Sequence, residues 1–581
     1  MSFLNKYIKK YGLIFIIGIL FLTIEALSDL LQPTIMARII DIGVKGKNGT
    51  YVIHQGILML GVACVGGLCA ALRAVIASHV SQRIGRELRL DLFKKIQTFS
   101  FANKDEFDEA SLITRLTSDV TQVQNFINGL MRIFVKAPIL CIGSVVMTVL
   151  LSPKMAVVLL VIIPIIIILI ILNLKISYPY FVKIQNALDR VNTVIREYLA
   201  GVRVVKAFNR ADYEEKRFEK ENAHLGEINM RASYTLALFS PMIQFTVHLG
   251  IVAVLWFSGF AIKNASIEVG EVMAFTNYMT QILFALSMIT HVFMSFVRAK
   301  ASAERMAVVF EQDSEIALYG LTEKGNDAFE TSNEKGTVSF ENVTFSYSQR
   351  LEDAVLKNIS FKCSAGETIG IIGPTGSGKS TLVNLIPGFY YPTSGMIKVD
   401  GIDIRTVDSK RLRKRIAIVP QKTMLFTGSI QDNIKWGKEH ATLDEIKEVA
   451  LVSEAHEFIT AFPEGYATYL GQGGINLSGG QKQRIAVARA LVKKPEILIL
   501  DDAASAIDLV TEGRMREGLK NYMKNLTTFI IAQRITSVIS ADRIIVLEAG
   551  EIVGIGKHYE LLRTCVAYKD IYRSQLGKEE I

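Results

Sequence analysis

The chain has 581 residues, of which 50% are hydrophobic and 21% are charged. This length exceeds one ordinary domain, and the apolar content exceeds that of an ordinary soluble protein. The net charge of +9 does not indicate nucleic-acid binding, because no basic helix or aromatic stacking pattern accompanies it. The five cysteines are odd in number and form no C-x-x-C pair, so neither a disulfide framework nor a metal site is indicated.

The first half of the chain contains apolar segments long enough to cross a bilayer, which takes about 20 residues. There are six, at about 12–37, 54–79, 131–151, 155–176, 238–262 and 271–297. The first is too long for a cleaved signal, and another span follows it. Lys and Arg gather at the amino end and in the long segments 80–130 and 177–237, which predicts that both termini and these segments are cytoplasmic.

The two long cytoplasmic segments have few glycines and mixed charge at helical spacing, so they are predicted to be helical. Near their middles lie two polar-apolar patches, Phe99-Ser100-Phe101 and Val204-Val205-Lys206-Ala207-Phe208. Each patch either lays a short helix across a soluble domain or forms a turn between long helices. The sequence leaves both interpretations open.

Two acidic residues, Glu25 and Asp29, lie inside the first predicted span. Acids at i and i+4 share a helix face, and membrane-embedded acids usually face water, a partner or a substrate. They are therefore candidate substrate-binding residues, with structural pairing or the lining of a water-filled cavity as the alternatives. Arg73 in the second span is a possible partner.

The chain changes character after the last span. Residues 1–300 are predicted to form the transmembrane domain, and the polar segment 301–335 a linker. From 336 to 581 strand-like runs alternate with helical patterns, which indicates an α/β domain. The predicted fold class is thus an all-α six-helix transmembrane domain with long cytoplasmic helical extensions, followed by an α/β domain.

A glycine-rich loop in the second half matches the P-loop pattern G-x-x-x-x-G-K-[ST]. It follows an apolar run of strand length and opens a helix, and it consists of Gly373, Pro374, Thr375, Gly376, Ser377, Gly378, Lys379, Ser380 and Thr381. Backbone N–H groups of such a loop surround phosphate oxygens, and the helix N-terminus adds positive potential. Lys379 is predicted to reach the β- and γ-phosphates of ATP, and the Ser380 hydroxyl to ligate Mg²⁺. The α/β domain is therefore predicted to be a P-loop nucleotide-binding domain.

Two further motifs follow at a characteristic spacing. A second glycine loop opening a helix consists of Leu477, Ser478, Gly479, Gly480 and Gln481. An apolar run, Ile497 to Leu500, then ends in Asp501, a carboxylate suited to an Mg²⁺-associated role. With these motifs the chain resembles ATP-binding cassette (ABC) exporters over nearly its whole length, in the half-transporter arrangement of six spans ahead of one cassette.

The resemblance implies roles for further residues. Tyr347 matches the aromatic that stacks on adenine, Gln421 matches the Q-loop glutamine, and Asp508 matches the D-loop aspartate. Ser380, Gln421 and Asp501 are the implied ligands of Mg²⁺. In this family each ATP lies between the P-loop of one chain and the LSGGQ of another, so the resemblance implies a dimer.

Two positions depart from the family pattern. Asp502 stands where the family usually has a glutamate acting as general base, and Gln533 stands where it has the switch histidine. The aspartate carboxylate is set back by roughly 1 Å, and a misplacement of that size costs about 10²-fold in rate. Glutamine hydrogen-bonds a γ-phosphate but neither carries an imidazolium charge nor shuttles a proton near neutral pH.

These departures resemble the degenerate half of heterodimeric ABC exporters. The chain is therefore expected to bind ATP and Mg²⁺ at a slow site and to give its LSGGQ to the fast site of a homologous partner with glutamate and histidine. The expected activity is ATP-driven export of an amphipathic drug, lipid or peptide across a bacterial plasma membrane, multidrug export being the most frequent role of similar heterodimers. No amino-terminal peptidase domain is expected. A homodimer hydrolysing with Asp502 and an ATP-gated regulatory or channel protein are the alternatives.

Overall fold

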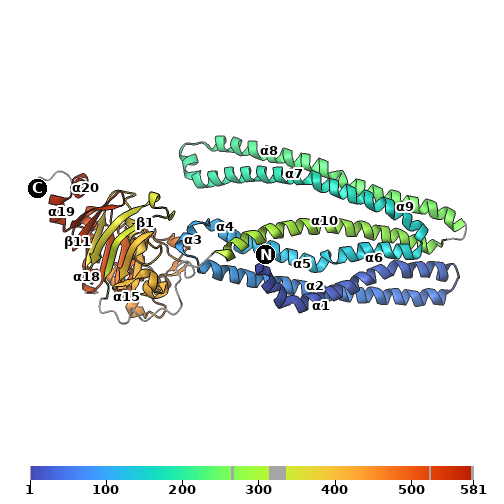
Figure 1. The fold of residues 1–581 in the computed structure, drawn as a ribbon, viewed down its shortest axis with the longest axis horizontal. Coiled ribbons are helices and arrows are strands. Elements are labelled where there is room, and N and C mark those ends of the chain that lie inside the picture. Colours follow the sequence, from blue (N-terminus) through green and yellow to red (C-terminus); the bar gives the residue numbers. More distant parts are fainter. Residues whose placement is uncertain (1, 264–266, 313–334, 523–524, 577–581) are drawn as a thin grey trace. The chain divides into compact units, whose positions relative to one another are not determined.

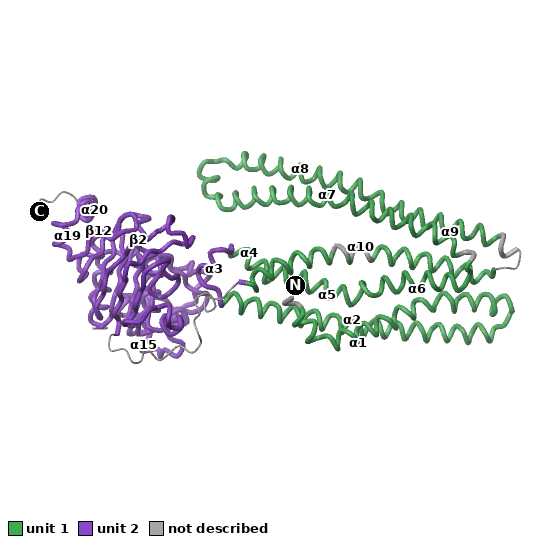
Figure 2. The backbone as a smooth tube through the Cα atoms, in the orientation of Figure 1, with its two compact units in different colours: residues 1–97, 109–311 green, residues 98–108, 312–581 purple. Residues whose placement is uncertain are grey.

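The computed structural model describes residues 2–263, 267–312, 335–522 and 525–576. The chain forms two compact units, which are distinguished by colour in Figure 2. Unit 1 comprises residues 1–97 and 109–311, and unit 2 comprises residues 98–108 and 312–581. The chain therefore enters unit 2 for a short stretch before it returns to unit 1.

The described residues of unit 1 form helices and no strand (Figure 1). The helices are α1 (Ser2–Arg38), α2 (Gly49–Gln97), α4 (Glu109–Thr114), α5 (Val120–Gly129), α6 (Lys136–Leu151), α7 (Pro153–Ala207), α8 (Ala211–Ala237), α9 (Phe239–Lys263) and α10 (Val269–Glu311). Three π-helical turns lie between them, namely η1 (Ile39–Val44), η2 (Arg115–Asp119) and η3 (Leu130–Phe134). The predicted helical character of the long segments 80–130 and 177–237 is confirmed.

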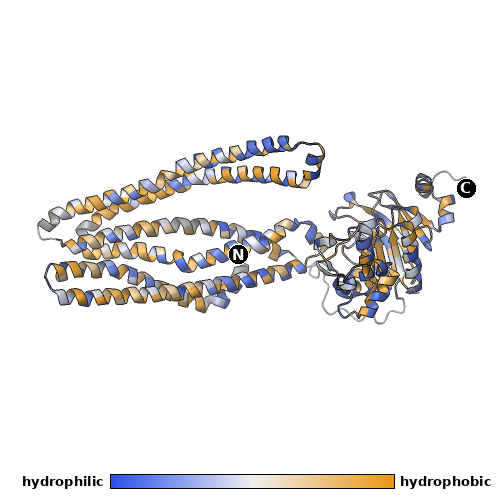
Figure 3. Ribbon diagram, turned by 180° about the vertical axis from the view of Figure 1, so that it is seen from behind, coloured by the Kyte–Doolittle hydropathy of each residue, from blue (hydrophilic) through white to orange (hydrophobic). Residues whose placement is uncertain are grey.

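Several of these helices have the length and apolar composition of membrane-spanning helices. Five stretches of the described residues are long and apolar enough to cross one: Asn5–Val44, Gly49–Gln97, Glu109–Leu151, Ala156–Ala207 and Ala211–Gly259. They correspond to the first five predicted spans. The sixth, at about 271–297, lies within α10, in which the side chains of residues 289–291 and 293–294 fall outside the described set. Hydrophobic residues follow the helices of unit 1 along most of their length, and hydrophilic ones gather at the α7–α8 turn (Figure 3).

The break between α6 and α7 has a local cause. Ser152 is extended, with φ −154° and ψ 98°, and Pro153 occupies the first turn of α7. Proline fits this place because the N–H that it lacks would have no helical partner there. The chain thus reverses at Ser152 and Pro153, between the helices that contain the third and fourth predicted spans.

Glycines allow the helices of unit 1 to approach closely. A Cβ on Gly143 would lie 2.3 Å from Leu30 Cδ1, and one on Gly250 would lie 2.0 Å from Ile162 Cδ1. Because glycine lacks a Cβ, the helices pack closely at these two positions. Close packing of this kind stabilises helix pairs in a membrane, where no hydrophobic effect drives helices together. Fully buried Tyr278 adds a polar contact, because its hydroxyl donates to the carbonyl of Leu30 at 2.5 Å.

Unit 2 is built on two main sheets. One has the order β2-β1-β4-β5 and consists of β1 (Val338–Phe345), β2 (Leu356–Cys363), β4 (Ser394–Val399) and β5 (Ile402–Asp403). The other has the order β12-β11-β3-β10-β9-β6 and consists of β3 (Thr368–Ile372), β6 (Ile416–Val419), β9 (Ile497–Asp501), β10 (Thr527–Ile531), β11 (Arg543–Glu548) and β12 (Glu551–Gly556). The first sheet is antiparallel; in the second only β12 pairs antiparallel.

Helices and one small ribbon complete unit 2. The helices are α12 (Lys379–Leu385), α13 (Ser409–Arg415), α14 (Ile430–Lys435), α15 (Leu443–Val452), α16 (His456–Thr460), α17 (Gly479–Leu491), α18 (Leu509–Tyr522), α19 (His558–Thr564) and α20 (Val566–Leu576). The ribbon pairs β7 (Gly428–Ser429) with β8 (Tyr469–Leu470). A core with the stacked rings of Phe340 and Phe361, 4.6 Å apart, includes side chains from both main sheets. The predicted class, a helical membrane part followed by an α/β part, is confirmed.

The short stretch 98–108 carries helix α3 (Phe101–Asp105) and belongs to unit 2. Ser100 caps the helix through a capping box with Asn103. The ring of Phe101 stacks on Phe389 at 4.3 Å, and the hydroxyl of Tyr390 donates to Asp105 at 2.7 Å. The interpretation of the first polar-apolar patch as a short helix across the soluble domain is therefore confirmed.

The second patch lies at the end of α7, and Val204 and Phe208 are exposed on unit 1. Helix α10 continues to Glu311, so the first part of the predicted linker 301–335 is helical. Residues 313–334 of that linker lie outside the described residues.

The carboxyl-terminal helices suggest a test of pH-dependent stability. The buried ring of His558 shares a hydrogen bond of 2.8 Å with the Tyr568 hydroxyl, and burial lowers the pKa of this histidine. A histidine pKa that folding lowers gives stability that is present above the unfolded pKa of about 6.5 and is lost as the pH falls through the folded value. We therefore expect the melting temperature of the full-length protein to fall less between pH 7.5 and 5.5 in His558→Gln than in the unmodified chain. Parallel pH profiles would contradict this.

Candidate functional site

The parallel strands of unit 2 bring the predicted catalytic residues to one edge. Strands β3, β10, β9 and β6 run in the same direction, and Ile531 pairs with both Ile371 and Asp501. Their carboxyl ends therefore open on the same side, where ligands bind in α/β sheets. One pocket there is lined by P-loop residues together with Gln421, Asp501, Asp502 and Gln533.

The P-loop requires glycine at two positions for different reasons. Gly378, which precedes α12, has φ +95°, and a Cβ on it would lie 2.8 Å from Leu356 Cδ2. A Cβ on Gly373 would lie 2.0 Å from the carbonyl oxygen of Leu547. The tight curvature directs the loop around the helix N-terminus, the arrangement that binds phosphate.

Polar groups of this loop suit a nucleotide and a divalent cation. Lys379 Nζ donates to the carbonyls of Gly373 and Pro374 at 2.8 and 2.7 Å, and Ser380 Oγ donates to Asp501 Oδ1 at 3.0 Å. Burial lowers the pKa of Lys379 and raises that of Asp501. The buried Ser377 hydroxyl has no hydrogen-bond partner among the described residues, so it offers a donor for a phosphate oxygen.

Asp502, Gln421 and Gln533 meet at one carboxylate oxygen. The side-chain amide of Gln421 donates to Asp502 Oδ2 at 3.3 Å, and that of Gln533 donates to the same oxygen at 3.2 Å. Asp502 has φ +50°, and its N–H donates to the Ile531 carbonyl at 3.0 Å. Both positions that depart from the family pattern therefore contact each other directly.

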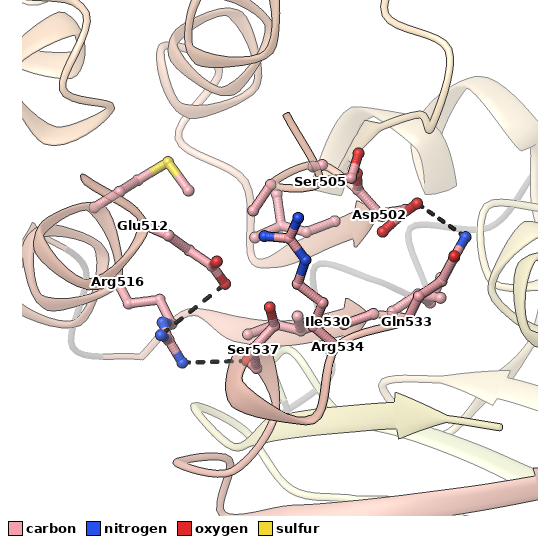
Figure 4. Close-up of a pocket in the computed structure, with 14 residues that line it drawn as sticks. Asp502, Ser505, Glu512, Arg516, Ile530, Gln533, Arg534 and Ser537 are labelled. Atoms are coloured by element: carbon pink, nitrogen blue, oxygen red, sulfur yellow. Dashed lines mark hydrogen bonds and ion pairs between the residues drawn. The ribbon is translucent and has the colours of Figure 1, made fainter. Parts of the chain in front are cut away.

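Asp502 and Gln533 also border a second pocket (Figure 4). Glu512 and Arg516 of α18 line its other side, and Arg516 donates to the backbone carbonyls of Thr536 and Ser537. Arg516 therefore ties α18 to the loop that follows Gln533. Asp508, the predicted D-loop residue, caps the start of α18 by accepting from the Thr511 N–H at 2.9 Å.

Tyr347 lies beside the P-loop helix. Its hydroxyl shares a hydrogen bond of 3.1 Å with Thr381 Oγ1, and its ring meets Phe345 and Tyr390 edge-on at 4.9 and 5.1 Å. About half of the residue is exposed. These contacts hold a partly free aromatic ring next to the phosphate loop.

The LSGGQ segment opens α17. Ser478 accepts a hydrogen bond from the Gln481 N–H, and Gln481 Oε1 accepts one from the Ser478 N–H at 2.9 Å, which closes a capping box. Leu477 is buried in the core, and a Cβ on Gly480 would lie 2.7 Å from the Ala506 carbonyl oxygen. None of Leu477, Ser478, Gly479, Gly480 and Gln481 is among the described residues that line the P-loop pocket.

Gln483 was not singled out from the sequence. Its buried side chain donates to Ser505 Oγ at 3.1 Å and to the Asp502 carbonyl at 3.4 Å, and accepts from the Ala506 N–H at 3.1 Å. It therefore joins the helix behind LSGGQ to the segment behind Asp502. In the sequence, the one indication of a role for Gln483 is its position two residues after Gln481.

Glu25 and Asp29 belong to a charged cluster inside unit 1. Arg73 Nε donates to Glu25 Oε2 at 2.7 Å, which confirms the predicted partner. Lys136 of α6 lies between the two carboxylates, at 2.6 Å from Glu25 Oε1 and 2.8 Å from Asp29 Oδ2. Lys136 was missed because it stands within an apolar run that was assigned to the third span.

Comparison with known proteins agrees with this architecture. Residues 15–286 match the family of the ABC transporter transmembrane region, and residues 356–505 match the ABC transporter family. The ABC transporter ATP-binding protein YfiB of Bacillus subtilis (strain 168) is 41% identical over 574 residues, covering 99% of this chain and 98% of YfiB. The putative multidrug export ATP-binding/permease protein YgaD of the same organism is 34% identical, covering 99% of this chain and 98% of YgaD.

A solved structure shares the fold. The structure of a bacterial Atm1-family ABC exporter with ATP bound has a TM-score of 0.79, covers 100% of both chains and is 24% identical. The membrane helices and the bacterial relatives agree with the predicted location in a bacterial plasma membrane. Together, the matched segments, the full-length relatives and the P-loop site show that this chain belongs to the ABC transporter family, as an ATPase coupled to transport across the membrane.

Proposed function

We propose that this chain is one subunit of a heterodimeric exporter that moves a hydrophobic or amphipathic compound out of a bacterial cell. Its own P-loop forms the slow ATP site, and its LSGGQ completes the fast site of a homologous partner. The observation that carries this proposal is the direct hydrogen bond between Asp502 and Gln533 at 3.2 Å. The name of YgaD, a putative multidrug export protein, supports the export of varied compounds.

The proposed slow site fits ATP and Mg²⁺. The P-loop would hold the phosphates, with Lys379 and the Ser377 hydroxyl as donors, and Tyr347 would stack on adenine. Ser380, Gln421 and Asp501 would hold Mg²⁺, which neutralises charge on the β- and γ-phosphates when it is bound. The hydrogen bond from Ser380 to Asp501 already places the two oxygen ligands together.

The reaction centre offers a poorer proton acceptor than a site with glutamate and histidine would. Asp502 is the carboxylate available for this role, and one of its oxygens accepts from two amides. Neither Gln421 nor Gln533 titrates, so neither takes up the proton that a water loses when it attacks phosphate. ATP is therefore bound at this site for longer than it is at a site with glutamate and histidine.

A second chain is needed to complete each site. The LSGGQ segment does not line the P-loop pocket of its own chain within the described residues. Its capping box and its glycines instead present a helix N-terminus on another part of unit 2. An N-terminus of this kind binds the phosphates of an ATP held by a partner's P-loop.

Two substitutions in this chain should separate the two sites of the heterodimer. We expect Asp502→Asn to leave Mg²⁺-ATPase turnover within about twofold of the unmodified transporter, because the partner's site performs most turnover. We expect Ser478→Ala to lower it by about 10²-fold, because Ser478 helps to complete the partner's site. The assay uses the chain co-expressed and purified with a homologous partner that has glutamate and histidine at these two positions. Near-complete loss in Asp502→Asn would overturn the slow-site assignment.

The chain purified alone provides a second test. We expect it to bind ATP with little hydrolysis, and the double variant Asp502→Glu/Gln533→His to hydrolyse about 10²-fold faster, because the carboxylate is moved forward and a titratable group is restored. Lys379→Ala is the control that removes nucleotide binding. Brisk hydrolysis by the unmodified chain would favour the alternative of a homodimer that hydrolyses with Asp502.

A gated channel is the second alternative, since a slow ATP site also suits a gate. ATP-dependent accumulation of a compound in inside-out membrane vesicles distinguishes an exporter from a channel, because a channel cannot build a concentration gradient. We expect accumulation that stops when ATP is omitted. Dissipation of a preset gradient by ATP would instead identify a channel.

A further inference from the structure

We infer that Asp29 is a binding site for the positively charged group of an amphipathic substrate, and that Lys136 is the internal cation that occupies Asp29 until such a substrate arrives. This inference rests on the proposed export function and names the charge of the compound that is exported. It also separates the two acidic residues of α1, because it assigns Glu25 a supporting role.

The two carboxylates differ in how far their oxygens are occupied. Both oxygens of Glu25 accept hydrogen bonds, Oε2 from Arg73 at 2.7 Å and Oε1 from Lys136 at 2.6 Å. Asp29 contacts Lys136 through Oδ2 alone, and no partner of its Oδ1 occurs among the described residues. Asp29 therefore keeps an acceptor available for a further donor, whereas Glu25 does not.

The solvent exposure of the cluster's side chains also favours Asp29 over Glu25 as the binding residue. The side chain of Glu25 is 8% exposed and that of Arg73 is 9% exposed, whereas Lys136 is 18% and Asp29 is 35% exposed. Ionised groups within a membrane face a bundle interior or a water-filled cavity rather than lipid. The exposed third of Asp29 therefore marks the face of α1 that meets water or a polar ligand.

The charges of this cluster allow a substrate cation to bind Asp29 in place of Lys136. The cluster contains two carboxylates and two cations, so its formal charge is zero. If Lys136 releases Asp29, it remains paired with Glu25, so neither the lysine nor either carboxylate is left without a counter-ion once a substrate cation occupies Asp29. An arriving anion would have to approach Lys136 between two carboxylates that repel it.

Polar side chains continue from Asp29 onto neighbouring helices. Gln281 of α10 donates to the Asp29 carbonyl at 3.2 Å and accepts from Ser144 of α6 at 3.1 Å. Asn277, one turn before Gln281, is exposed. Gln281 and Ser144 thus place polar groups beside the backbone of Asp29 within largely apolar helices, which suits a compound with one charged group and a large apolar body.

Probes that differ mainly in charge test the inference. They are the cation tetraphenylphosphonium, the anion tetraphenylborate and the uncharged triphenylphosphine oxide, measured by equilibrium binding to the purified full-length chain in nanodiscs. We expect the unmodified chain to prefer the cation over the anion. We expect Asp29→Asn to weaken binding of the cation at least tenfold, which corresponds to about 1.4 kcal/mol, and to leave binding of the uncharged probe unchanged.

Two further variants make the result specific. Asp29→Glu keeps the charge and should restore cation binding. Leu31→Asn places the same new side chain on a neighbouring exposed position of α1 and should not affect cation binding. A preference for tetraphenylborate, or an equal loss of all three probes in Asp29→Asn, would overturn the inference. The comparison of charges in the unmodified chain needs no variant, so a preference for tetraphenylborate overturns the inference even if Asp29→Asn fails to fold.

Binding and transport are measured separately, so the two proposals can fail independently. ATP-dependent accumulation of the uncharged probe in inside-out vesicles without any preference for the cation would support export and overturn the role of Asp29. Selective cation binding that depends on Asp29, without accumulation of any probe, would support the binding site and overturn export.

Discussion

Parallel pairing in the larger sheet of unit 2 is the constraint on which the site depends. Asp501 ends one strand, while the P-loop, Gln421 and Gln533 each follow another. They meet only because those strands end at the same edge. A shift of one residue in this register would turn each side chain to the opposite face of the sheet. The buried strand Ile497–Asp501 holds the register by filling both faces with apolar side chains up to the final carboxylate.

The sequence allowed much of this to be predicted because the relevant patterns are local. Glycines in the P-loop follow from the tight curvature of one loop, and the spans follow from unbroken apolar runs. Lys136 and Gln483 could not be predicted in the same way. Lys136 meets Glu25 across 111 positions of the chain, and Gln483 meets Ser505 across 22. Such contacts depend on how helices pack, and no local pattern encodes that.

A carboxylate shared between two donors occurs at both centres of the protein. Glu25 lies between Arg73 and Lys136 in unit 1, and Asp502 lies between Gln421 and Gln533 in unit 2. In each case one acceptor holds side chains from separate segments, so the departure of one donor leaves the other in place. The membrane centre uses charged donors, which suit a Glu25 carboxylate that is largely buried, whereas the nucleotide centre uses neutral amides.

The placement of α3 in unit 2 affects how the protein can be divided. Its Phe101 covers Phe389, and its Asp105 accepts from Tyr390, yet it precedes the rest of unit 2 by some two hundred residues of unit 1. A fragment that starts at the linker would lack this helix and leave two aromatic side chains uncovered. The nucleotide-binding part is therefore not encoded by one contiguous piece of the gene. A truncated version would expose an aggregation-prone aromatic patch that α3 covers in the whole chain.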